Sequence, residues 1–263
     1  MSAEGALLFA RYAYPPNELG YCGPADAAAL LRRDATADIE RRARQFEGAW
    51  CYLQFLAETA GVQDPLDARV VEAYWIGNEL LDLADPAALV ERMTDRFRGQ
   101  LGGTWREAGR RALAHHSFQV FEVYPWAPIL RSSGHPTALT VLDRCRIRTG
   151  VVIRADSDVA TVRSRPLCWD GTGLADGAWR EEEVRHTADG QTLIDRLSPG
   201  DQVALHWDWV CDVLTDEQAQ RIEFLEERRR TELGLLVPCT SSATTPQPGV
   251  SPLSLGCTVE RTL

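Results

Sequence analysis

One cysteine and one histidine, Cys145 and His206, are the residues of this sequence best suited to carry chemistry. Cys145 opens the segment Cys-Arg-Ile-Arg-Thr-Gly, which ends at Gly150, and His206 ends the segment Gly-Asp-Gln-Val-Ala-Leu-His, which begins at Gly200. If the first and last strands of one small sheet carry them, the thiol and the imidazole lie close together. Such a pair suits iron, copper or zinc better than Mg²⁺ or Ca²⁺. The sequence therefore predicts a metal site at Cys145 and His206.

The stretches between the two motifs have the composition of strands and are separated by turn sequences such as Asp156-Ser-Asp and Ala188-Asp-Gly. Strands are expected at residues 147–154, 159–165, 183–186, 192–197 and 202–209. Several short strands in one stretch are typical of a small closed barrel such as an OB-like fold. Thr215 and Gln218 form a capping-box pattern, which predicts a helix directly after the barrel.

The first half of the chain has a helical pattern instead. Apolar residues from Ile39 to Ala60 recur at steps of three and four, which predicts one helix that ends at Gly61. Asp85 followed by Pro86 is a typical helix start. Further helices are expected at residues 67–81 and 105–113, whereas the aromatic and β-branched residues of 118–124 predict a strand.

The predicted fold is therefore α+β with two domains. Residues 1–138 form a mainly helical domain, and residues 139–236 form a small OB-like β-barrel with a C-terminal helix. Turn-forming residues at 131–136 mark the boundary between them. Residues 237–263, rich in Thr, Ser, Pro and Gly without periodicity, are expected to be a disordered tail.

Composition excludes several classes of function. A formal charge of −10 argues against nucleic-acid binding, which needs clustered cations. All 28 basic residues are arginine and the sequence contains no lysine. A catalytic Schiff-base lysine and a P-loop lysine are therefore excluded. The seven cysteines lack CxxC spacing, which argues against a disulfide framework or an ordinary structural zinc site. No apolar run approaches the ~18 residues of a membrane span. A cytoplasmic protein without membrane contact is expected.

The order of the motifs resembles a known family. Cys145, four residues, Gly150, short strands, Gly200-x5-His206 and an acidic helix are similar to the HypC/HupF-type nickel–iron hydrogenase assembly chaperones, over residues 145–233. The resemblance implies that Cys145 holds an iron fragment bearing cyanide and carbonyl ligands. It also implies that His206 is a second ligand or a base. The expected partners are the hydrogenase large-subunit precursor and a HypD-type scaffold, and the expected work is binding rather than turnover.

An enzyme in the helical domain is the alternative, with the barrel as a docking module. Cys22 before a helix start, with His116 as base and Glu122 as its orienter, supplies the ingredients of a thiol catalyst, and His115 is a further candidate. Such an enzyme could supply a ligand of the metal centre. The same residues are more typical of structural turns and a capping serine.

The segment that begins at Arg163 combines Arg163, Arg165 and Trp169 within a short stretch. Arginine and tryptophan are favoured anchors at protein interfaces, so this loop is a candidate partner-binding surface. The same composition also fits an ordinary strand end and turn.

Overall fold

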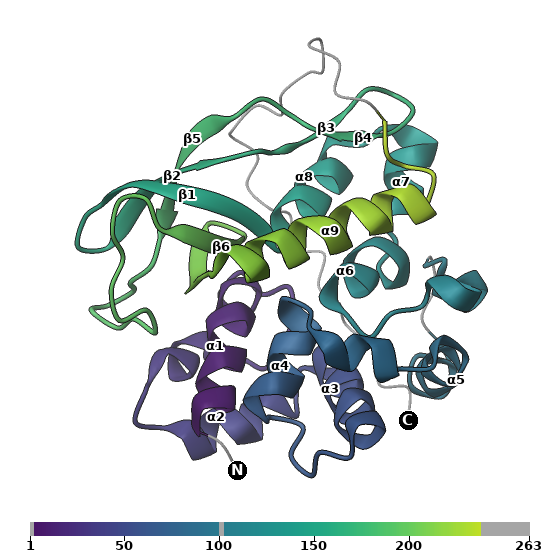
Figure 1. Ribbon diagram of the computed structural model, residues 1–263, viewed down its shortest axis with the longest axis horizontal. Coiled ribbons are helices and arrows are strands. Elements are labelled where there is room, and N and C mark those ends of the chain that lie inside the picture. The colour runs from purple at the N-terminus through teal and green to yellow at the C-terminus, as the bar shows by residue number, and fades with distance from the viewer. Residues whose placement is uncertain (1–2, 100–102, 238–263) are drawn as a thin grey trace.

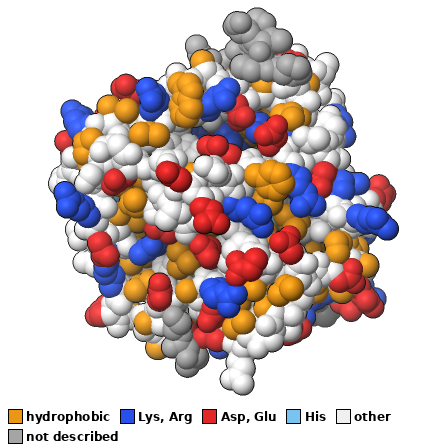
Figure 2. All heavy atoms as spheres, in the orientation of Figure 1, with side chains coloured by type: hydrophobic (Ala, Val, Ile, Leu, Met, Phe, Trp, Pro, Cys, Tyr) orange, Lys and Arg blue, Asp and Glu red, His pale blue; other side chains and the backbone are white. Residues whose placement is uncertain are grey.

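The computed structural model describes residues 3–99 and 103–237, which form an α+β fold. A group of helices lies below a five-stranded sheet, and the long helix α9 (Asp216–Glu232) crosses between them (Figure 1). Helix α9 contacts the strands β1 (Arg148–Ala155) and β6 (Gln202–His206) on one side and the short helix α6 (His116–Phe118) on the other. On the face seen in Figure 2, charged side chains of both signs are interspersed with apolar ones rather than gathered into one field.

The helices occupy most of the first part of the chain. They are α1 (Ala3–Glu18), α2 (Thr36–Ala43), α3 (Glu47–Ala60), α4 (Ala68–Trp75), α5 (Pro86–Arg96), α6 (His116–Phe118), α7 (Trp126–Ser133), α8 (Pro136–Cys145) and α9 (Asp216–Glu232). Short 3-10 turns cover Ala27–Leu31, Glu79–Leu83, Trp105–Glu107 and Gly109–Arg111, and a π-helix covers Gln119–Val123.

Several helix ends lie where the local chemistry predicts them. The Asp85 carboxylate accepts hydrogen bonds from the first backbone amides of α5, and Gly61 ends α3 in the left-handed conformation. The Thr215–Gln218 capping box starts α9. The single helix predicted between Ile39 and Ala60 is wrong, because it is broken into α2 and α3. Phe46 leaves the helical conformation there, and its ring packs edge-on against Phe9 at 5.3 Å.

Three other local predictions are wrong or only partly right. Residues 118–123 are helical rather than extended, and only Tyr124 has an extended backbone. The stretch from Phe118 to Val123 is buried, and its apolar and β-branched residues reflect that burial. Residues 105–113 form only two 3-10 turns. The helix expected over 67–81 ends at Trp75, and Gly77 follows with a positive φ of 96°.

Five strands form one sheet: β1 (Arg148–Ala155), β2 (Val159–Ser164), β5 (Arg180–Arg185), β6 (Gln202–His206) and β7 (Trp209–Val213). Their order is β1-β2-β5-β7-β6, and β1 also pairs with β6, so the pairing returns to its start. A single parallel pair, Arg185 with Trp209, joins β5 to β7, and the other pairings are antiparallel. We call these five strands the strand ring. Strands β3 (Leu167–Trp169) and β4 (Leu174–Asp176) pair separately.

The strand predictions hold for β1, β2 and β5 within a few residues. No strand forms over 192–197, where the chain is irregular with bends at Leu193 and Asp195. The strand predicted over 202–209 is a hairpin, with β6 and β7 joined by Trp207 and Asp208. Cys145 is not on the first strand but ends α8, because the His135 cap and Pro136 start a helix that continues to the cysteine.

Apolar side chains connect the two parts of the fold. The strand ring has its own cluster of buried valines and leucines, including Val162, Val184 and Leu205. The largest cluster joins α1, α3 and α4 to Trp209 and Cys211 of β7 and to Ile222 of α9. Residues from both sides of the predicted boundary at 138/139 therefore share one core. The predicted tail, 237–263, lies outside the described residues apart from Val237. Among the described residues, no helix has the length and apolarity that crossing a membrane requires.

Gly150, the glycine of the Cys-x4-Gly motif, has a packing role in β1. A Cβ at this position would lie 2.5 Å from Cγ1 of Val162 and 3.2 Å from Cδ1 of Leu205. We therefore expect Gly150→Ala to lower the free energy of unfolding by about 1–3 kcal/mol, the usual cost of overpacking a core. Urea unfolding measures it.

Gly99→Ala is the control, because a Cβ at Gly99 would meet no atom within 4 Å. If the two variants had the same free energy of unfolding, the side chains around Gly150 would accommodate the added methyl group without loss of stability.

Candidate metal centre

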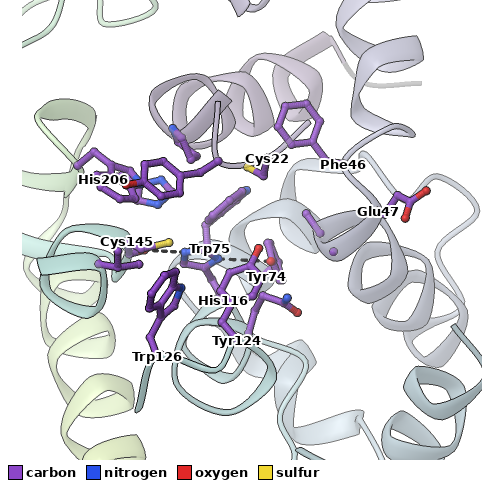
Figure 3. A pocket seen from close by; sticks show the side chains of 17 residues that line it. Cys22, Phe46, Glu47, Tyr74, Trp75, His116, Tyr124, Trp126, Cys145 and His206 are labelled. Atoms are coloured by element: carbon purple, nitrogen blue, oxygen red, sulfur yellow. Dashed lines mark hydrogen bonds between the residues drawn. The ribbon is translucent and has the colours of Figure 1, made fainter. Parts of the chain in front are cut away.

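Three buried side chains from three different elements meet between the helices and the strand ring. His116 lies on α6, Cys145 ends α8 and His206 ends β6. A ring nitrogen of each histidine and the sulfur of Cys145 all lie within 4.8 Å of one another. In Figure 3 the Cys145 sulfur lies beside the imidazole of His116. The structure thus brings the two predicted ligands together and adds His116, the predicted base of the alternative thiol site.

Hydrogen bonding fixes the protonation of His206. Its Nδ1 lies 2.8 Å from the carbonyl oxygen of Tyr12, which can only accept, so Nδ1 carries the proton. Nε2 is buried and has no hydrogen-bond partner among the described residues. Burial, and then the neighbouring His116, lower the pKa of His206 well below its ordinary value. His206 is therefore a neutral imidazole with an available lone pair on Nε2, the state that binds metals.

His116 is held between two partners, drawn as dashed lines in Figure 3. Its Nε2 lies 2.8 Å from the carbonyl oxygen of Cys145, and its Nδ1 lies 3.3 Å from the hydroxyl of Tyr74. Nε2 therefore donates to the carbonyl, and Nδ1 accepts from the hydroxyl. A metal ion at Nε2 would replace that proton, and Nδ1–H would then donate to Tyr74. Burial lowers the pKa of His116 to about 4, so this imidazole is also neutral at pH 7.

The third donor is a protonated thiol. Burial above all, followed by the nearby Cys22, raises the pKa of Cys145. A thiol in such surroundings is a poor nucleophile, because the thiolate is the reactive form. A bound cation reverses this balance, because coordination deprotonates a thiol. The geometry and the charge therefore favour Cys145 as a ligand over Cys145 as a catalyst.

A strained tryptophan flanks the site. Trp207 follows His206 in the β6–β7 turn and has a φ of 58°, in the left-handed region that bulky side chains rarely adopt. Its indole stacks on Tyr21 with ring centroids 4.3 Å apart, and its backbone amide donates to the carbonyl of Arg144. Strain of this kind persists only where surrounding contacts impose it, which is frequent at functional sites.

A cavity of about 90 Å³ opens beside the three donors. Cys22, Trp126 and Trp207 also line it, and its walls are mostly apolar. The predicted pair Cys22 and His116 thus shares one cavity.

The predicted orienter, Glu122, does not face His116. Its carboxylate binds Arg229 at 2.7 Å and Arg111 at 3.2 Å. His115 caps α6, with its Nδ1 accepting from the Ser117 amide, and it does not belong to the donor group.

The predicted partner-binding residues have different neighbours in the structure. The guanidinium groups of Arg163 and Arg165 lie over the ring of Trp179, at 5.6 and 5.9 Å. Trp169, on β3, packs instead against a separate cluster formed with α7 and α8. Their binding of a partner stays a prediction.

A family of unknown function, DUF6390, matches residues 1–237. The chain belongs to this family. The match spans both the helices and the strand ring, so the DUF6390 unit contains His116, Cys145 and His206 together. No curated protein and no solved structure matches the chain.

The depressed pKa of His116 predicts how stability depends on pH in the metal-free protein. Between its folded pKa of about 4 and the unfolded value of ~6.5, the unfolded chain binds the extra proton, so stability falls as pH falls. From pH 7 to pH 5, the wild type should lose about 2 kcal/mol more unfolding free energy than His116→Gln. Chemical denaturation with a chelator present measures the difference.

Tyr74→Phe is the matched control, because it removes the hydroxyl partner of His116 but leaves the imidazole. It should follow the pH dependence of the wild type. If His116→Gln and the wild type lost the same stability, the pKa of His116 would be the same in the folded and the unfolded chain, and burial would not lower it.

Proposed function

We propose that this protein binds a transition-metal ion, or a small fragment that contains one, through His116, Cys145 and His206. The observation that carries the proposal is the convergence of these three donors within 4.8 Å, all of them buried. Two imidazoles and a thiolate suit zinc, copper, iron, cobalt or nickel. Three protein ligands leave a coordination position open, as in zinc sites that accept an exogenous ligand.

The electrostatics of the donors support binding of a cation. The two histidines are already neutral, so only Cys145 must release a proton when the metal binds. The carbonyl of Tyr12 orients His206 and the hydroxyl of Tyr74 orients His116, as outer partners orient metal-binding histidines in general. The cavity beside the donors gives room for a further ligand on the metal.

The resemblance to the HypC/HupF-type chaperones suggests what the cargo is. On that resemblance the strand ring would be an OB-like barrel, and the protein would act in nickel–iron hydrogenase maturation. Cys145 and His206 would hold an iron fragment with diatomic ligands in transit to the large-subunit precursor, with a HypD-type scaffold as the second partner. His116 would then be a third donor to the same fragment.

The alternative function is a thiol enzyme that uses Cys22. The observation in its favour is that Cys22 and His116 line the same cavity. The two proposals require different thiols. The enzyme would need Cys22, whereas metal binding would need Cys145.

The test is a titration of the purified full-length protein with Co²⁺, with thiolate-to-metal charge-transfer absorption as the readout. We expect one equivalent to bind with that absorption. Cys145→Ser should abolish the absorption and weaken binding by at least ~100-fold, because loss of an outer partner alone costs 10–100-fold. His206→Ala should weaken binding similarly.

Cys168→Ser is the matched control, since Cys168 is as buried as Cys145 but lies on β3, outside the cavity. It should bind Co²⁺ like the wild type. Unchanged Co²⁺ binding in Cys145→Ser would contradict the proposal, and loss in Cys22→Ser alone would favour the alternative.

A further inference from the structure

A second cavity, of about 260 Å³, lies between α9 and the start of β1. Its walls include Arg146, Arg148, Arg165 and Glu226, and it shares no lining residue with the cavity at the metal centre. Charged side chains dominate its walls, whereas the walls of the first cavity are mostly apolar. The two cavities are therefore suited to different ligands.

Three of its charged side chains are buried and incompletely paired. Arg146, Arg148 and Glu226 are 5%, 2% and 3% exposed. Among the described residues, Nε of Arg146, Nη1 of Arg148 and Oε2 of Glu226 each have no hydrogen-bond partner. Leaving such groups unpaired in a buried site costs free energy, so several of them around one cavity indicate a missing partner.

A fourth side chain, Arg165, has no carboxylate of the described residues within ion-pair distance. Its guanidinium donates only to the backbone carbonyls of Gly177 and Asp176, at 2.9 and 3.0 Å. Arg230, which lines the same cavity, instead forms a bidentate ion pair with the Asp176 carboxylate, with both distances at 3.1 Å. The unmatched positive charge at the cavity therefore belongs to Arg165.

Glu226 behaves as a donor near neutral pH. Burial raises the pKa of its carboxyl to about 7, against the opposing effect of Arg146 and Arg230. A protonated carboxyl donates a hydrogen bond, and a deprotonated one would repel an anion. At slightly acidic pH the cavity thus presents guanidinium and carboxyl donors together.

We propose that this second cavity binds a small oxyanion, held by Arg165, by Arg146 and Arg148, and by the carboxyl group of Glu226. The planar guanidinium group of arginine carries paired N–H donors that match the geometry of carboxylate and phosphate oxygens. The site is connected to the metal centre through the chain: Arg146 follows Cys145, and Arg148 donates to the carbonyl of Trp207, next to His206, at 2.8 Å. An occupant would therefore contact arginines that adjoin two of the three metal donors, through the chain at Cys145 and through Trp207 at His206.

Calorimetric titration of the full-length protein at pH 6 with acetate and with sulfate tests the proposal. Acetate stands for a carboxylate ligand and sulfate for a phosphate-like one, and the tighter binder identifies the class. Arg165→Gln should weaken binding at least about tenfold. Arg163→Gln is the matched control, because both arginines lie over Trp179 but only Arg165 lines the cavity; it should change binding less than about twofold.

The pH dependence gives a second test that a structural role would not reproduce. In the wild type, the dissociation constant of either anion should rise about tenfold from pH 6 to pH 8 as Glu226 loses its proton. Glu226→Gln keeps a donor without the titration, so its dissociation constant should stay constant. The other charged groups around Glu226 are Arg146, Arg229, Arg230, Asp176, Glu223 and Glu227.

Two results would overturn the proposal. One is the failure of both anions to bind the wild type at millimolar concentration. The other is binding that Arg165→Gln and Arg163→Gln weaken equally, with the pH dependence kept in Glu226→Gln. Either result leaves the metal proposal intact, because Co²⁺ titration reports on a different cavity.

Discussion

The hydrogen bond from His206 to the Tyr12 carbonyl is the contact on which the site depends. It joins β6 of the strand ring to α1 of the helical part, across 194 positions of sequence. Its acceptor is a backbone carbonyl, so it fixes both the ring orientation and the tautomer of His206. Trp75 fills the space beside it, with its ring 5.4 Å from Tyr12 and 5.7 Å from His206. The same packing that builds the core therefore aims the Nε2 lone pair at the other two donors.

Behind the donors, a buried ion-pair network holds the segments that carry Cys145 and His206. Glu182 of β5 binds Arg148 at 3.1 Å, Arg144 at 2.6 Å and the Ser164 hydroxyl. Burial alone would raise the pKa of Glu182, but the two arginines lower it to about 2. Removing one partner of such a buried network typically costs 3–5 kcal/mol. Arg144 precedes Cys145 and Arg148 binds the carbonyl after His206, so one carboxylate anchors both sides of the centre.

Helix ends that depend on local chemistry could be predicted from the sequence. The Asp85 cap, the Gly61 stop and the Thr215 capping box are confirmed, because each depends on a few adjacent residues. The sequence-based prediction failed where tertiary packing decides the local structure, as in the buried helical stretch 118–123. The proximity of Cys145 and His206 was expected, although from a strand rather than the end of α8. His116 was missed as a partner of Cys145, because only the packing of α6 against α8 and the strand ring reveals that contact.

X-ray absorption spectroscopy of the full-length protein loaded with one equivalent of Zn²⁺ tests the central claim most directly, because it identifies the donor atoms. With His116, Cys145 and His206 as ligands, the first shell should contain one sulfur at about 2.3 Å and two imidazole nitrogens at about 2.0–2.1 Å. One light atom from solvent should complete it. A first shell without sulfur would contradict the account, because the metal would then lie away from Cys145.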